Sequence, residues 1–139
     1  MKQNLVIAAL LGALACCGLY AQSEMRANIP FEFQAGKRIL PAGDYLIRQD
    51  GPWVILSVAD TAKSAMALMS NTASAKDALA PGAHLEFHSY GSAYFLTAVF
   101  NGVSGVGREL LPTSREKELI KVAQRGNRLS QRTISVASR

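Results

Sequence analysis

The chain has 139 residues, with 15 lysines and arginines against 10 aspartates and glutamates, and a formal net charge of +5 at pH 7. Its two cysteines, Cys16 and Cys17, both lie among the first 21 residues. Removal of that segment would therefore exclude thiol catalysis and structural disulfides. The 118 residues that follow are enough for one domain with a substantial hydrophobic core.

The first 21 residues are predicted to be a secretory signal peptide. Lys2 gives a positive start, residues 5–15 form an apolar run, and Ala21 is the small residue after which we expect cleavage. Two alternatives stay open, namely lipidation at Cys16, which follows a weak lipobox, and an uncleaved membrane anchor. We expect a periplasmic or extracellular protein, which a lipid on Cys16 would instead tether to a membrane.

The segment that follows has the pattern of β-strands. Residues 28–33 alternate apolar and polar after Pro30, which predicts a strand start or an edge position because proline cannot donate a ladder hydrogen bond. Residues 44–49 and 53–59 are predicted as two strands. Asp50-Gly51 between them is typical of a tight hairpin turn.

The middle of the chain is less regular. Residues 65–69 fit a weak strand, although their alanine and methionine content also suits a short helix. Residues 70–82 are small and polar, and we expect a loop there.

The clearest hairpin joins residues 84–90 to residues 93–100 through Gly91-Ser92. Alternation directs Leu85 and Phe87 into the core. We expect this hairpin to form the hydrophobic centre of the domain.

A helix is predicted to begin near Thr113, because Thr113 and Glu116 fit a capping box in which both side chains satisfy free backbone amides. Gly126 provides the left-handed residue that ends a helix. No acidic residue follows Glu118. Residues 126–139 are therefore predicted to be a basic, disordered tail.

These elements predict a mainly β fold, an antiparallel β-sandwich or partly closed barrel of six to eight strands with one C-terminal α-helix. The predicted organisation is a signal peptide at residues 1–21, a β-rich domain with its helix at residues 22–125, and the basic tail at residues 126–139.

Five motifs, taken in order, resemble a group of small exported bacterial β-proteins of unassigned function. They are Ile29-Pro30-Phe31-Glu32-Phe33, Leu40-Pro41-Ala42-Gly43-Asp44-Tyr45, Leu85-Glu86-Phe87-His88-Ser89-Tyr90-Gly91, Tyr94-Phe95-Leu96 and Ser114-Arg115-Glu116-Lys117-Glu118. The resemblance covers residues 28–121 and implies export, a single domain and the order of the hairpins. It implies no activity, because the group has no catalytic residue to transfer.

The candidate metal ligands are His84, Glu86 and His88, which alternation places on one face of a strand. Imidazole and carboxylate suit zinc or copper, but the two histidines would lie about 13 Å apart on a regular strand, too far for one ion. The alternative interpretation is a solvated face opposite Leu85 and Phe87. No catalytic residue and no cofactor-binding residue is predicted.

We therefore expect a non-enzymatic exported β-domain with a binding or structural role at the cell envelope or outside the cell. The excess of basic over acidic residues favours an anionic envelope polymer or lipid surface as partner. Export argues against nucleic acid as a partner. Two other hypotheses remain. One is a carrier of lipid or carbohydrate in a barrel cavity, and the other is a metal-dependent enzyme that uses His84, Glu86 and His88.

Overall fold

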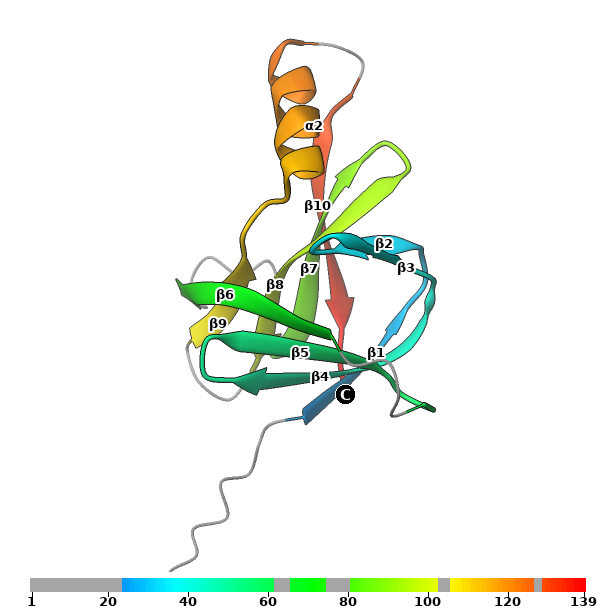
Figure 1. Ribbon diagram of the computed structural model, residues 1–139, viewed down its shortest axis with the longest axis vertical. Coiled ribbons are helices and arrows are strands. Elements are labelled where there is room, and N and C mark those ends of the chain that lie inside the picture. The colour runs from blue at the N-terminus through cyan, green and yellow to red at the C-terminus, as the bar shows by residue number, and fades with distance from the viewer. Residues whose placement is uncertain (1–23, 62–65, 75–80, 103–105, 127–128) are drawn as a thin grey trace, which may run out of the picture.

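The computed structural model of the chain describes residues 24–61, 66–74, 81–102, 106–126 and 129–139 (Figure 1). The predicted signal peptide, with Cys16, lies outside the described residues. The described strands and helix, in chain order, are β1 (Glu24–Ile29), β2 (Phe33–Ala35), β3 (Arg38–Leu40), β4 (Gly43–Asp50), β5 (Trp53–Val58), β6 (Met66–Ser74), β7 (Ala83–Tyr90), β8 (Ala93–Asn101), β9 (Val106–Leu110), α2 (Ser114–Gln124) and β10 (Gln131–Ala137).

The strands form one sheet that curves into a partly closed barrel. Its order is β1-β4-β5-β6-β9-β8, and β7 and β10 continue it from β8. Two backbone hydrogen bonds between Arg26 and Arg139, of 3.1 and 2.8 Å, then join β1 to the residues that follow β10. The predicted mainly β fold with a C-terminal helix is confirmed, although the described strands number ten and exceed the predicted six to eight.

A β-bulge in β8 divides that strand between two neighbours. The register with β7 shifts between Glu86 and Phe87, and Thr97 on β8 is left without a cross-strand partner. On one side of the bulge, Ala98 and Val99 pair with β9, and on the other side Phe95 makes a parallel pair with β2. The bulge thus allows β8 to hold both the barrel wall and the short β2–β3 hairpin.

Both predicted hairpins are confirmed, but the first turn lies one residue later than predicted. Asp50 belongs to β4 and pairs with Trp53, so the turn residues are Gly51 and Pro52 and not Asp50 and Gly51. In the second hairpin Tyr90 pairs with Ala93, which leaves Gly91 and Ser92 as the predicted turn. Gly51 and Gly91 have φ angles of 54° and 65°, a region that costs glycine little because it lacks a Cβ.

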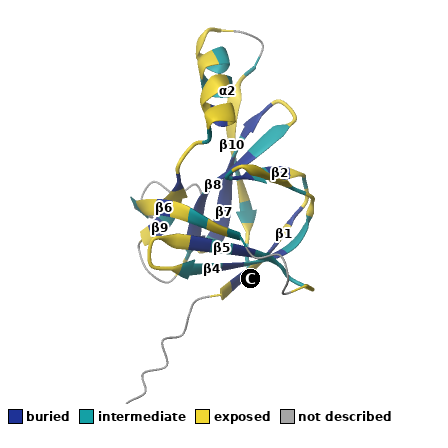
Figure 2. Ribbon diagram, in the orientation of Figure 1, coloured by how far each residue is buried: buried dark blue, intermediate teal, exposed yellow. Residues whose placement is uncertain are grey.

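The interior of the barrel is filled by alternate side chains of its strands. On β1 the pattern is strict, with Met25, Ala27 and Ile29 buried and the residues between them exposed (Figure 2). Phe33 makes edge contacts with Tyr45 and Phe87 at ring-centroid distances of 5.3 and 5.5 Å. Aromatic contacts therefore join β2, β4 and β7 across the core.

The prediction of a disordered tail is wrong over Gln131–Ala137, because these residues form β10 along β7. Ile134 and Val136 are half-buried opposite Phe87 and Leu85, whereas the intervening residues are exposed. The arginines of this segment obscure its alternation of apolar and polar residues. The strand is stable only when it pairs with β7, which is distant in the sequence.

The predicted loop at residues 70–82 is also wrong in part. Strand β6 continues to Ser74, because Ser70–Ser74 pair with β9. Near the N-terminus, the first strand begins earlier than predicted and ends before Pro30, which separates it from β2. Both differences arise from pairing with residues far along the chain.

Gly107 on β9 gives a test of the packing. A Cβ at Gly107 would lie 2.4 Å from the Phe100 ring and 2.9 Å from the Val99 carbonyl oxygen. We expect Gly107→Ala to lower the free energy of unfolding by about 1 to 3 kcal/mol, measured by urea denaturation. The control is Gly43→Ala, whose Cβ would meet its nearest neighbour at 3.9 Å and should change stability by less than about 1 kcal/mol. Equal losses in both variants would contradict the packing explanation.

Candidate functional site

Strand β7 is buried on both of its faces. Leu85 and Phe87 lie in the core as predicted, but His84 and Glu86 on the opposite face are only 2% and 8% exposed. The interpretation of this face as solvated is therefore wrong for these two residues. The His84 ring stacks on Phe100 of β8, with centroids 4.9 Å apart, and this contact helps to exclude water.

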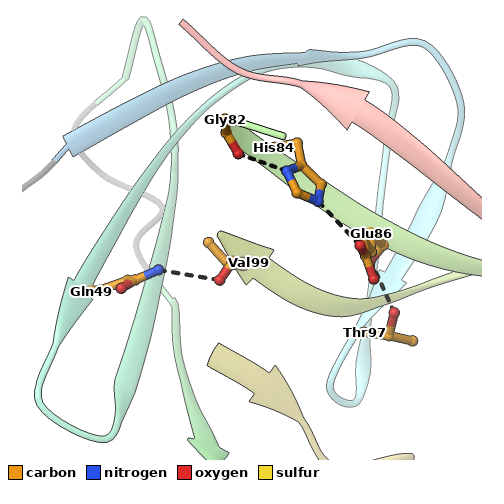
Figure 3. Close-up of polar contacts among 6 residues, drawn as sticks. All are labelled: Gln49, Gly82, His84, Glu86, Thr97 and Val99. Atoms are coloured by element: carbon orange, nitrogen blue, oxygen red, sulfur yellow. Dashed lines mark hydrogen bonds and ion pairs between the residues drawn. The ribbon is translucent and has the colours of Figure 1, made fainter. Parts of the chain in front are cut away.

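His84 and Glu86 form a pair within this face (Figure 3). Nδ1 of His84 lies 2.8 Å from the Gly82 carbonyl oxygen and must donate to it, while Nε2 lies 3.1 Å from Oε1 of Glu86. Both ring nitrogens are thus occupied inside the protein.

The backbone around the pair is fixed by side-chain hydrogen bonds. The hydroxyl of Thr97, at the bulge, donates to the Glu86 carbonyl oxygen at 3.1 Å. From the far side of the core, Nε2 of Gln49 on β4 donates to the Val99 carbonyl oxygen at 3.3 Å (Figure 3). These bonds satisfy carbonyls near the bulge and hold β8 against β7 and β4.

The second half of the face is organised by Glu116 of helix α2. Its carboxylate accepts from Nδ1 of His88 at 2.9 Å and from the Tyr90 hydroxyl at 3.4 Å, and Glu116 is only 3% exposed. The hydroxyl of Thr113 accepts from the Glu116 backbone N–H at 3.2 Å, which confirms the predicted N-cap. In the expected capping box, the Glu116 carboxylate would accept from a backbone amide at the start of the helix. It accepts instead from His88 and Tyr90 of β7.

Glu116 changes the acid–base chemistry of Tyr90. Burial, and then the charge and hydrogen bond of Glu116, raise the pKa of the Tyr90 hydroxyl to about 12. Burial also raises the pKa of Tyr45. Tyr90 therefore stays protonated as a hydrogen-bond donor to Glu116 well above neutral pH.

The predicted metal ligands do not converge. His84 pairs with Glu86, whereas His88 pairs with Glu116, and no three His, Cys, Asp or Glu side chains of the described residues are placed to hold a metal ion. Sequence reasoning missed Glu116 as a partner, since the capping pattern identified the residue but not the strand it would contact.

A hollow of about 330 Å³ opens beside this face, over β6 to β9. Its polar lining comes from Thr72, Glu86, His88, Thr97 and Glu109. The Glu86 carboxylate already bonds to His84, and Nδ1 of His88 bonds to Glu116, so the main role of these groups is to stabilise the fold.

A second feature is the basic end, which we define as residues 114–139 and which contains α2 and β10. It holds seven of the 15 lysines and arginines and two of the 10 aspartates and glutamates. The net charge of this segment, +5, equals that of the whole chain, so residues 1–113 are balanced. In Figure 1, α2 stands at one end of the molecule, away from β1 and β4, whereas β10 runs back from that end and the C-terminus lies beside β1.

Comparison with known proteins gives no relative, because no family model, curated protein or solved structure matches the chain. Among the described residues, no helix has the length and apolar character needed to cross a membrane.

The buried carboxylate of Glu116 can be tested against a neighbour on the same helix. We expect Glu116→Ala to lower the free energy of unfolding by about 1 to 3 kcal/mol, because His88 and Tyr90 lose a buried acceptor. Glu118→Ala is the control, since the Glu118 side chain is 72% exposed and its loss should cost less than about 0.5 kcal/mol. Equal effects in urea denaturation would show that Glu116 does not anchor the helix.

The raised pKa of Tyr90 predicts a loss of stability in alkali. Between pH 10 and about 12 the unfolded chain ionises Tyr90 while the folded chain keeps the proton, so stability present below pH 10 falls across this interval. We expect the wild type to lose about 2 to 3 kcal/mol more than Tyr90→Phe between pH 9 and about 12 in urea denaturation. Parallel losses in the two proteins would contradict the assignment to Tyr90.

Proposed function

We propose that the chain is an exported, non-enzymatic β-domain that binds the anionic lipid surface of a cell envelope through its basic end. The observation that carries this proposal is the segregation of charge, because the whole net charge of the chain lies in residues 114–139. Export is supported by the Lys2 start and the apolar run at residues 5–15.

The burial pattern strengthens the positive field of the basic end. Glu116 is buried against His88 and Tyr90, so its negative charge does not face solvent. Glu118 forms an exposed pair with Lys121 at 3.2 Å. Exposed Arg115, Lys117 and Arg125 make no ion pair with the described residues and remain available to an anionic surface.

The filled interior favours a scaffold over a carrier. The side chains of Phe33, Phe87 and Ile47 are 1% exposed or less and occupy the space in which a barrel carrier would hold its ligand. The separate pairing of His84 and His88 likewise gives no support to a metal-dependent enzyme. A rigid core that carries the exposed cations of α2 at one end of the molecule fits a surface-binding role.

Binding to vesicles tests the proposal. We expect Lys117→Gln/Arg125→Gln to weaken binding to phosphatidylglycerol–phosphatidylcholine vesicles about 10- to 30-fold at low salt, since each cation near such a surface contributes about 1 kcal/mol. The matched control is Lys37→Gln/Arg38→Gln, which removes the same charges from an exposed turn residue and from the exposed first residue of β3. It should weaken binding less than about threefold.

Two results would contradict the proposal. Equal losses in both double variants would show that total charge, not the basic end, determines binding. Binding of the wild type to a soluble polyanion without any binding to the vesicles would indicate that the partner is an acidic polymer and not a lipid surface. Cosedimentation at low and high salt measures both.

A further inference from the structure

One polar row crosses the end of the barrel beside the β7–β8 turn. Arg132 on β10 is the cross-strand partner of Ser89 on β7, and Ser89 is the partner of Tyr94 on β8. Direct partners share a face of a sheet, and neighbouring strands are about 5 Å apart. The row therefore places a guanidinium and two hydroxyls on one face over a span of about 10 Å.

A hollow of about 330 Å³ lies over this row. Its lining includes Arg132, Ser89, Tyr94, Gly91, Ser130 and Ile134. This volume is at the lower end of the range for small-ligand sites, about 300 to 1,000 Å³. The hollow has room for a small polar molecule or a lipid headgroup.

The groups of the row differ in the hydrogen bonds they offer. The Ser89 hydroxyl already donates to the Gly91 carbonyl oxygen at 3.3 Å, so its oxygen is left to accept from a ligand. The Tyr94 ring stacks on Phe31, with centroids 4.1 Å apart, which fixes the position of its hydroxyl. Arg132 forms no ion pair with any described residue, and its guanidinium can only donate.

This donor and acceptor pattern favours a ligand that carries an anion beside a hydroxyl. Arg132 and Tyr94 suit the oxygens of an anion, whereas Ser89 suits a hydroxyl that donates. A carboxylate alone offers two acceptor oxygens and no donor. A phosphate ester of a small polyol offers an anion and a neighbouring hydroxyl in one molecule, and can occupy more of the row.

We propose that this hollow binds the phosphate group of a polyol phosphate, with the phosphate at Arg132 and a polyol hydroxyl at Ser89. The inference rests on the proposed attraction to anionic lipid and adds the group that is recognised. The same chemistry occurs in soluble glycerol phosphate and in the headgroup of phosphatidylglycerol. The basic end supplies non-specific attraction, and the hollow supplies the specific contact.

The experiment measures binding of glycerol 3-phosphate and inorganic phosphate to the full folded protein by calorimetry and by NMR chemical shifts. We expect Arg132→Gln to weaken glycerol phosphate binding about tenfold or more, because a charge-assisted hydrogen bond is lost. Arg125→Gln is the control, since it removes the same charge from the same end outside the hollow and should change affinity less than about threefold. Tyr94→Phe, which keeps the stacked ring, should weaken binding about threefold or more.

The outcomes separate this site from the proposed function. Equal effects of Arg132→Gln and Arg125→Gln, or no binding of glycerol phosphate at millimolar concentration, overturn the site even where vesicle binding persists. Equal affinity for inorganic phosphate overturns the polyol contact at Ser89. Competition between glycerol phosphate and phosphatidylglycerol vesicles, lost in Arg132→Gln, supports the lipid headgroup as source. Binding of glycerol phosphate without such competition supports the site and assigns it to soluble ligand.

Discussion

The burial of both faces of β7 is the constraint on which the rest of the structure depends. One face contributes Leu85 and Phe87 to the core, and the other carries polar side chains that must find partners inside the protein. His84 and Glu86 satisfy each other, but His88 and Tyr90 need a group from elsewhere. Glu116 meets that need, and helix α2 is thereby fixed to the barrel.

The docking of α2 in turn determines the path of the C-terminal segment. After the helix, the chain returns along β7 as β10, pairs with it from Gln131 to Ala137, and reaches β1 through the bonds between Arg139 and Arg26. A residue buried at the start of the helix thus contributes to the near-closure of the barrel. The same arrangement keeps the Glu116 carboxylate away from solvent and leaves Arg115, Lys117 and Arg125 at the surface.

Local signals were sufficient to predict the hairpins and the helix, but long-range pairing was not predictable. Gly51 and Gly91 mark turns of two residues, and Thr113 marks a helix start, because each geometry is decided within a few residues. The strand around Ile134 becomes evident only beside Phe87, which is 47 residues earlier. The sequence placed His84, Glu86 and His88 in one row, but it could not indicate that His84 and Glu86 are buried.

The difference between a tail and a strand changes what the basic end can recognise. Arginines on a disordered tail attract any anionic surface, because no geometry relates one charge to another. In β10, Arg132 is held opposite Ser89, and Ser89 opposite Tyr94, so the backbone of a cationic residue has a fixed place beside two residues that carry hydroxyls. Fixed distances permit discrimination between anions of different shape, since a ligand that fails to reach one group leaves it unpaired. Pairing of β10 with β7 therefore gives Arg132 a defined place in the fold, beside the hollow.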